Sequence, residues 1–85
     1  MSNKFTSIPD EIYFLCILHN VGATNSGRAL TLEEIVRWTA TDPPKAEENL
    51  AKLIENGYVG VSEVSGVKKY FITIDGIRKV LSMYS

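Results

Sequence analysis

The sequence has little of what disulfides and metal sites are built from. Its 85 residues include one cysteine and one histidine, Cys16 and His19. A single cysteine cannot close an intrachain disulfide, and two ligands per subunit make a poor metal site. A metal-responsive sensor would need Cys16 and His19 in one site, with a pair of them across a dimer interface as the conceivable arrangement. We therefore expect no metal and no other cofactor, and a reducing cytoplasm is the expected compartment.

Long apolar runs are also missing. The longest uninterrupted run is residues 12–18, whereas a membrane-spanning helix needs about 20 apolar residues. Residues 1–9 contain one lysine and no long apolar run, so they do not match a signal peptide. We expect no membrane association.

Neither sign of charge dominates. Nine lysine and arginine residues stand against ten aspartate and glutamate residues, for a net charge of −1. A protein that packages DNA without sequence preference would be strongly basic, so that class is excluded. Hydrophobic residues make up 45% of the chain, which is typical of a folded domain. Residues 1–85 are expected to form a single small domain with one modest core.

Catalytic groupings are not evident. Cys16 and His19 share a helix face by their spacing, but no third group is placed to orient them for nucleophilic catalysis. The glycine-containing segment 21–27 lacks the Gly-Lys-Ser/Thr ending of a phosphate-binding loop. We expect that the protein is not an enzyme.

Two helices are predicted in the first half of the chain. The first covers residues 8–20, with Pro9 in its first turn and Asp10 and Glu11 at its positive end. The second covers residues 32–39, because Thr31 and Glu34 have the spacing of a capping box. Between them, residues 28–30 are expected to form a very short strand.

The third helix is predicted over residues 43–56. Asp42 is placed to cap it, and Pro43 and Pro44 suit its first turn. Its apolar residues form one stripe of helical period: Ala46, Leu50, Leu53 and Ile54. Gly57 is expected to end the helix in the left-handed conformation.

The hydrophobic period then changes to two, which predicts a hairpin over residues 58–73 with a two-residue turn at Ser65 and Gly66. Pairing outward from this turn places Glu63 opposite Lys68. Thr73 can cap a last helix over residues 74–84. Its apolar stripe consists of Ile77, Val80, Leu81 and Tyr84.

This order of elements is that of a winged helix-turn-helix. The segment 50–59 resembles the end of the recognition helix and the entry into the wing in MarR-type and ArsR-type regulators. The segments 70–76 and 30–35 are similar to the wing exit and the second-helix start of the same families. The resemblance covers residues 8–84 and implies an α+β, mostly α, fold with a three-helix core, a β-hairpin wing and a C-terminal helix.

The resemblance also implies sequence-specific binding of double-stranded DNA by a homodimeric transcriptional regulator, with the third helix in the major groove. Carried over to this sequence, the expected nucleic-acid-binding residues are Arg28, Arg37, Thr41, Lys45, Glu48, Asn49, Lys52, Lys68 and Lys69. Two alternatives stay open, since Glu48 can pair with Lys52 along the helix and Lys68 with Glu63 across the hairpin.

A homodimer is expected because the first helix is apolar on more than one side. The predicted interface consists of Ile12, Phe14, Leu18, Phe71, Leu81 and Tyr84. The alternative function is a protein-interaction module with little or no DNA binding, because winged helices also serve in that role. The negative net charge and the acidic third helix favour it, with a protein partner docked on Glu47, Glu48 and Glu55 or beside Phe71.

Overall fold

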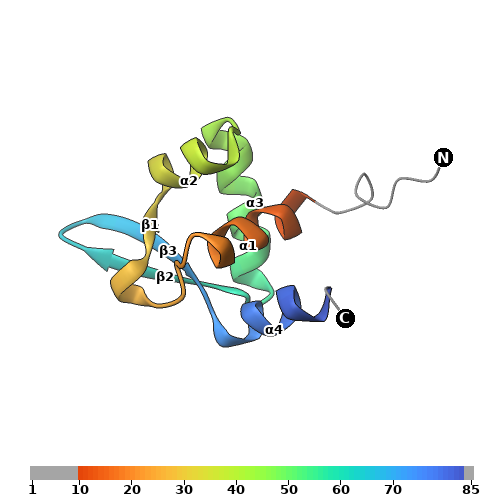
Figure 1. Cartoon of the computed structure of the whole chain (residues 1–85). Coiled ribbons are helices and arrows are strands. Elements are labelled where there is room, and N and C mark those ends of the chain that lie inside the picture. The colour runs from red at the N-terminus through yellow and green to blue at the C-terminus, as the bar shows by residue number, and fades with distance from the viewer. Residues whose placement is uncertain (1–9, 84–85) are drawn as a thin grey trace.

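A helical bundle carries a β-hairpin that projects from one side (Figure 1). The computed structural model describes residues 10–83 of the chain. Their elements are α1 (Asp10–Asn20), η2 (Ser26–Arg28), β1 (Leu30–Thr31), α2 (Leu32–Thr39), α3 (Pro43–Glu55), β2 (Val59–Val64), β3 (Val67–Ile72) and α4 (Ile74–Ser82). The strands form an antiparallel sheet in the order β1-β3-β2. The expected fold class, a mostly α winged helix, is confirmed.

The core lies where α1, α2 and α3 meet the base of the hairpin. Leu15, Leu18 and Leu53 have no exposed surface, and Leu50 is 1% exposed. The complete buried cluster consists of Phe14, Leu15, Leu18, Ala23, Ile35, Ala46, Leu50, Leu53, Val59, Tyr70, Ile72 and Val80. None of the helices within residues 10–83 combines the length and apolar character needed to cross a bilayer.

The prediction for one apolar residue of α3, Ile54, is wrong. Ile54 was predicted to pack with Leu50 and Leu53, but it is 38% exposed. Around the helix axis Ile54 lies about 40° from Leu50 but about 100° from Leu53, so it is at the edge of the buried stripe. Ile54 therefore adds apolar surface to the outward side of α3.

The capping box that starts α2 is confirmed. The Thr31 hydroxyl accepts the Glu34 backbone N–H at 3.2 Å, and the Glu34 carboxylate accepts the Thr31 backbone N–H at 2.9 Å. The hydrogen bond from the Thr31 backbone lowers the pKa of Glu34, because it favours the charged carboxylate. The box fixes the residue at which the chain leaves β1 and enters α2.

The short strand before α2 lies later than predicted. Residues 26–28 form a turn of 3-10 helix instead, because the Asn25 side chain accepts the Arg28 backbone N–H at 3.1 Å. The strand consists of Leu30 and Thr31, which pair with Tyr70 and Lys69 of β3.

The two ends of α3 follow different rules. Asp42 occupies the N-cap position, but its side chain makes no capping hydrogen bond. Pro44 has no N–H, so only one of the two usual donors remains for a cap. At the other end, Gly57 is left-handed with φ of 78°, and the Tyr58 N–H donates to the Leu53 carbonyl at 2.9 Å. This ending turns the chain directly into β2.

The hairpin has the predicted turn and register. Ser65 and Gly66 both have positive φ, as in the two-residue turns that match strand twist. Val59 pairs with Ile72, and Glu63 lies opposite Lys68.

Thr73 ties the base of the wing to α4. Its backbone N–H donates to the Tyr58 carbonyl at 2.9 Å, and its hydroxyl donates to the Gly57 carbonyl at 2.7 Å. The same hydroxyl accepts the Gly76 N–H at 3.0 Å, so it also caps α4 as predicted. Gly76 is buried against this junction.

We expect Gly76→Ala to destabilise the protein. A Cβ at this position would overlap the Tyr58 carbonyl oxygen and lie 2.6 Å from Ile72 Cγ1. Overpacking of this kind costs about 1–3 kcal/mol, which outweighs the gain of about 1 kcal/mol from the better helix propensity of alanine. Urea denaturation measures the difference, with the exposed Lys79→Ala in the same helix as the control. An unchanged or higher unfolding free energy for Gly76→Ala would contradict the tight junction.

We expect Glu34→Ala to lower the unfolding free energy at neutral pH by about 0.5–1 kcal/mol, because it removes half of the capping box. The pKa of Glu34 is lower in the folded protein, so the charged carboxylate contributes stability above its unfolded pKa. That contribution is lost as the pH falls through the folded pKa. The gap between Glu34→Ala and wild type should therefore narrow in acid. Urea denaturation at about pH 7 and about pH 3 tests this, and an equal gap at both pH values would contradict it.

Candidate nucleic-acid interface

The outward face of α3 is defined by the leucines on its inward face. Because Leu50 and Leu53 are buried, residues on the opposite side of the helix point away from the core. The exposed charged residues of this helix are Lys45, Glu47, Glu48, Lys52 and Glu55. Three carboxylates against two ammonium groups make the face slightly acidic. Within residues 10–83, Glu48 and Lys52 do not form an ion pair.

Asn49 does not belong to this face, which corrects its prediction as a groove contact. It is only 3% exposed and lies on the packed side of α3. The helical period contained the signal, since residue 49 follows Ala46 by three and precedes Leu53 by four. Its Nδ2 is buried and has no hydrogen-bond partner among the described residues.

The turn between α2 and α3 is tight and partly strained. Ala40 is left-handed with φ of 53°, a conformation that favours glycine. Thr41 is half-buried, and its hydroxyl donates to the Thr39 carbonyl at 3.0 Å. The exposed Lys45 follows in the first turn of α3, where its Nζ lies 4.0 Å from Asp10 Oδ2 of α1. An exposed pair at this distance holds the lysine weakly, so Lys45 stays available to a phosphate.

The two wing lysines differ in their surroundings. Lys68 is exposed near the turn, and within the described residues it forms no ion pair with Glu63 opposite. Lys69 is half-buried, and its charge contributes to lowering the pKa of Glu34, as does Arg37 to a smaller extent. The tip of the wing is apolar. Val64 at the end of β2 is 56% exposed, and Val67 at the start of β3 is 47% exposed.

The two arginines lie on different elements. Arg37 is exposed in the last turn of α2. Arg28 is exposed at η2, a segment that contacts β2 and β3. The two arginines therefore belong to separate parts of the fold.

The residues predicted for a dimer interface fall into three groups. Phe14 and Leu18 are 2% and 0% exposed and belong to the core of the chain itself, and Ile12 is buried as well. The prediction that these three residues lie in a dimer interface is therefore wrong, because they are buried within the domain itself. Phe71 is half-buried beside Gly60, and Leu81 is 52% exposed. Tyr84 lies outside the described residues.

Cys16 and His19 are both half-buried on α1. Burial raises the pKa of the Cys16 thiol, because it disfavours the charged thiolate. Residues 10–83 hold no group of three or more histidine, cysteine, aspartate or glutamate side chains arranged for a metal ion.

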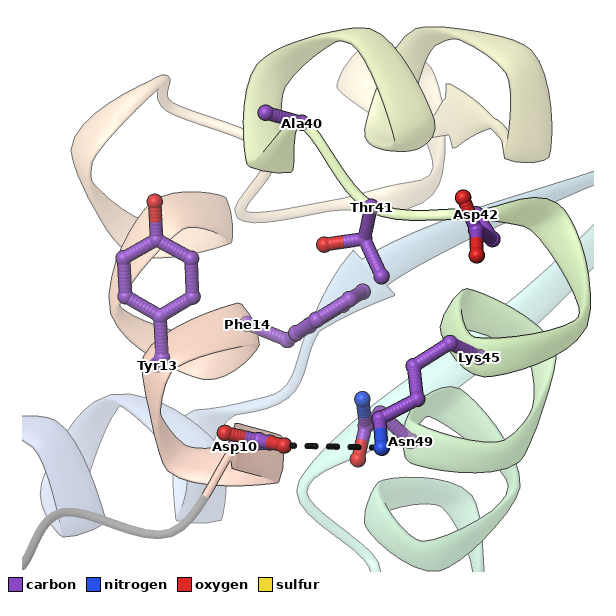
Figure 2. A pocket seen from close by; sticks show the side chains of 8 residues that line it. All are labelled: Asp10, Tyr13, Phe14, Ala40, Thr41, Asp42, Lys45 and Asn49. Atoms are coloured by element: carbon purple, nitrogen blue, oxygen red, sulfur yellow. Dashed lines mark ion pairs between the residues drawn. The ribbon is translucent and has the colours of Figure 1, made fainter.

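A cavity between α1 and α3 was not foreseen from the sequence. It lies beside the α2–α3 turn, with a volume of about 500 Å³, and Figure 2 shows the side chains that line it. They are Asp10, Tyr13, Phe14, Ala40, Thr41, Asp42, Lys45 and Asn49. The helical period of α3 places Asn49 on this side of the helix. No local sequence pattern joins the other residues, because they come from separate elements.

The chain is similar to solved structures of DNA-binding proteins. It matches the DNA-binding fragment of TubR from Clostridium botulinum with a TM-score of 0.76 and 23% identity, over 98% of each chain. It matches S. aureus MepR in complex with DNA with a TM-score of 0.74 and 18% identity, over 91% of this chain and 62% of MepR. It matches Bordetella bronchiseptica BpsR, whose DNA binding is regulated by 6-hydroxynicotinic acid, with a TM-score of 0.77 and 24% identity, over 93% and 62% of the two chains.

No protein-family model matches the sequence, and no curated protein is similar to it in sequence. The chain spans about three-fifths of the length of MepR and BpsR. Another similar structure is a zinc-responsive MarR family member, ZitR of Lactococcus lactis, at 18% identity. Sequence identities of 18–24% support a shared fold but do not show a shared function. The expected resemblance to MarR-type regulators is therefore confirmed as a shared fold, and the chain has the winged-helix architecture of these DNA-binding proteins.

Proposed function

We propose that the protein binds double-stranded DNA in a sequence-specific manner and regulates transcription as a homodimer. The observation that carries the proposal is the free face of α3 beside the projecting wing, in the fold that MepR uses in its DNA complex. In this docking mode α3 enters the major groove and the wing contacts the backbone. The chain then acts as one winged-helix domain in the cytoplasm, without enzymatic activity.

Phosphate contacts are assigned to the cations around α3. Lys45 lies at its start, Lys68 on the wing and Arg37 at the end of α2, and all three are exposed. Lys69 and Thr41 are half-buried, so they are assigned to phosphates that lie close to the protein surface. One subunit makes few such contacts, so useful affinity requires two subunits on one site.

Base contacts are assigned to Glu48 and Lys52, which lie one turn apart on the free face of α3. A glutamate accepts a hydrogen bond from cytosine N4, and a lysine donates to guanine O6 or N7. These two residues therefore suit a site that contains G·C pairs.

Dimerisation is supported by apolar surface on α4. Ile74 is 71% exposed and Leu81 is 52% exposed. Large exposed apolar side chains at the end of a small domain are typical of a surface that a second subunit covers.

A second candidate function is a protein-interaction module. A shallow hollow on the free face of α3 is lined by Ile54 and Ala51, with Glu48, Lys52 and Glu55 around them. An apolar centre ringed mainly by carboxylates suits a partner with a basic rim and an apolar anchor.

Selection from a random duplex-DNA pool at two salt concentrations, with the mass in solution measured alongside, separates the two functions. The proposal expects sequence-enriched, salt-sensitive binding by a dimer. No binding at low salt, where electrostatic attraction is strongest, would refute DNA binding and favour the protein-interaction module.

We expect the triple substitution Lys45→Ala, Lys68→Ala and Lys69→Ala to weaken binding to every duplex. Each lost phosphate contact should reduce the slope of log K against log salt by about 0.9. Titrations at several salt concentrations measure this slope. Lys79→Ala on α4 is the matched control, and the docking mode is falsified if the triple variant keeps the wild-type slope.

We expect Glu48→Gln to relax the preference for one base pair, by about 1–3 kcal/mol, because glutamine at that position donates as well as accepts. Glu47→Gln removes the same charge from the neighbouring residue and should strengthen binding to all duplexes equally. Competition assays with a set of single-base variants of the selected site compare the two. Equal effects of both substitutions at every base pair would show that Glu48 does not contact a base.

A further inference from the structure

One edge of the three-stranded sheet is open. The strand order is β1-β3-β2, so β2 is bonded on one side only, and the hairpin that it belongs to projects from the helices (Figure 1). Proteins usually protect such an edge with proline, lysine, a β-bulge or a covering segment. β2 contains no proline and no cation, and its register with β3 runs without a bulge from Val59 to Val64. This strand is therefore available for pairing with another strand.

The register shows which backbone groups of β2 face the open side. The Thr73 N–H donates to the Tyr58 carbonyl, so these two residues form a hydrogen-bonded pair. Such pairs alternate with non-hydrogen-bonded pairs along an antiparallel ladder. Residues 60, 62 and 64 therefore bond to β3, whereas the N–H and C=O groups of residues 59, 61 and 63 point away from it. Within residues 10–83 the backbone groups of Val61 and Glu63 make no hydrogen bond on this side.

The side chains of the edge are apolar on both faces of the sheet. Val61 is 43% exposed on one face, and Val64 is 56% exposed on the other. The Phe71 ring lies over Gly60, because a Cβ on Gly60 would be 2.5–3.0 Å from three atoms of that ring. The ring thus takes the place of a side chain at the edge. A strand laid along β2 would cover these apolar groups.

The charge of β2 selects a register for pairing with a second copy of itself. Glu63 carries the only charge of the strand. Antiparallel pairing centred on Glu63 would place two carboxylates directly opposite each other, which is unfavourable. Pairing centred on Val61 would place each carboxylate beside Val59, which is 3% exposed. Pairing centred on Ser62 avoids both contacts.

In the register centred on Ser62 the two copies complement each other. Val64 of each copy lies beside Gly60 of the other, where it can pack on the Phe71 ring. Glu63 of each copy lies beside Val61 of the other and keeps Lys68 of its own chain on its opposite side. The exposed valines of both edges are therefore covered, and each carboxylate has a cation next to it.

The size of this contact makes it weak and reversible. Two short strands bury well under the roughly 1,000 Å² that a stable interface needs. A dissociation constant of about 1 mM is expected in solution. The contact becomes strong only where two copies are already held close together, because their effective concentration is then in about the millimolar range.

From this geometry we propose that the open edge of β2 is an interaction surface for β2 of a second copy of this chain. The two strands pair antiparallel about Ser62 and join their sheets into one continuous sheet. Lys68 and Lys69 lie on β3, one strand away from the seam, so they stay free for other contacts. The pairing uses neither α4 nor DNA, and its test is therefore independent of the proposed function.

Disulfide trapping of the full chain tests the register. A Cys16→Ala background leaves one thiol per chain when Ser62→Cys is added. The two Cys side chains then face each other in a non-hydrogen-bonded pair, with Cα atoms about 4.5 Å apart, which suits a disulfide. With oxidised glutathione this protein should form a covalent dimer about tenfold faster than Val67→Cys, an exposed position on β3 that reports random collision. Val61→Cys should also be slow, because its two Cα atoms are diagonal and about 7–8 Å apart.

A dilution series of the ¹⁵N-labelled wild-type chain, up to about 1 mM, tests the open backbone groups. The amide resonances of Val61 and Glu63 should shift with concentration more than those of Ser62 and Val64, whose N–H groups bond within the hairpin. Val61→Pro should abolish these shifts, because it removes one outward N–H and no bond of the hairpin. Val61→Thr keeps the N–H and the branched shape, and it should retain them.

Three results would overturn the proposal. One is equal trapping of Ser62→Cys and Val67→Cys, which would show collision alone. Another is fastest trapping of Val61→Cys, which would show a different register. The third is concentration-dependent shifts that are absent, lack the alternation or persist in Val61→Pro. If Val61→Pro does not fold, Ser62→Lys replaces it, since it puts two lysines directly opposite each other and should abolish the shifts.

Discussion

The burial of Leu50 and Leu53 against α1 is the constraint on which the rest of the structure depends. Both side chains are almost completely removed from solvent, and their fit into a close-packed core fixes the rotation of α3 about its own axis. That rotation turns Lys45, Glu48 and Lys52 outward and Asn49 inward. A rotation by one residue, about 100°, would already turn part of the free face into the core. The chemistry of the candidate interface therefore follows from two leucines that are not part of it.

The wing is positioned by the same helix. The left-handed Gly57 ends α3 and sends the chain straight into β2, and Thr73 then bonds both Gly57 and Tyr58 on the return path. Three hydrogen bonds of Thr73 thus join the end of α3, the base of the hairpin and the start of α4. The base of the wing is therefore fixed to the end of α3 by hydrogen bonds.

Features with a local physical cause were predictable from the sequence. The Thr31–Glu34 capping box and the Ser65–Gly66 turn depend on residues within a few positions of one another, and the structure contains both. Features that depend on distant neighbours were not predictable. The sequence shows that α1 is apolar on several sides. Only the fold shows that Phe14 and Leu18 are buried in the core of the domain. The cavity was hidden for the same reason, since its walls come from three elements. The orientation of Asn49 is the exception, because the period of α3 contained it.

The near-neutral charge of the free face has a consequence for recognition. Carboxylates on α3 repel the phosphates of every duplex, so they weaken binding to all sequences by a similar amount. Base contacts act only at the correct site, and the biologically relevant quantity is the ratio between specific and non-specific affinity. A strongly basic helix would raise both affinities and leave the protein distributed over the genome. An acidic helix lowers the non-specific affinity and makes occupancy depend on the few groove contacts. The acidic α3 is therefore compatible with DNA recognition, provided that its base contacts are good and its phosphate contacts come from the wing and the first turn of the helix.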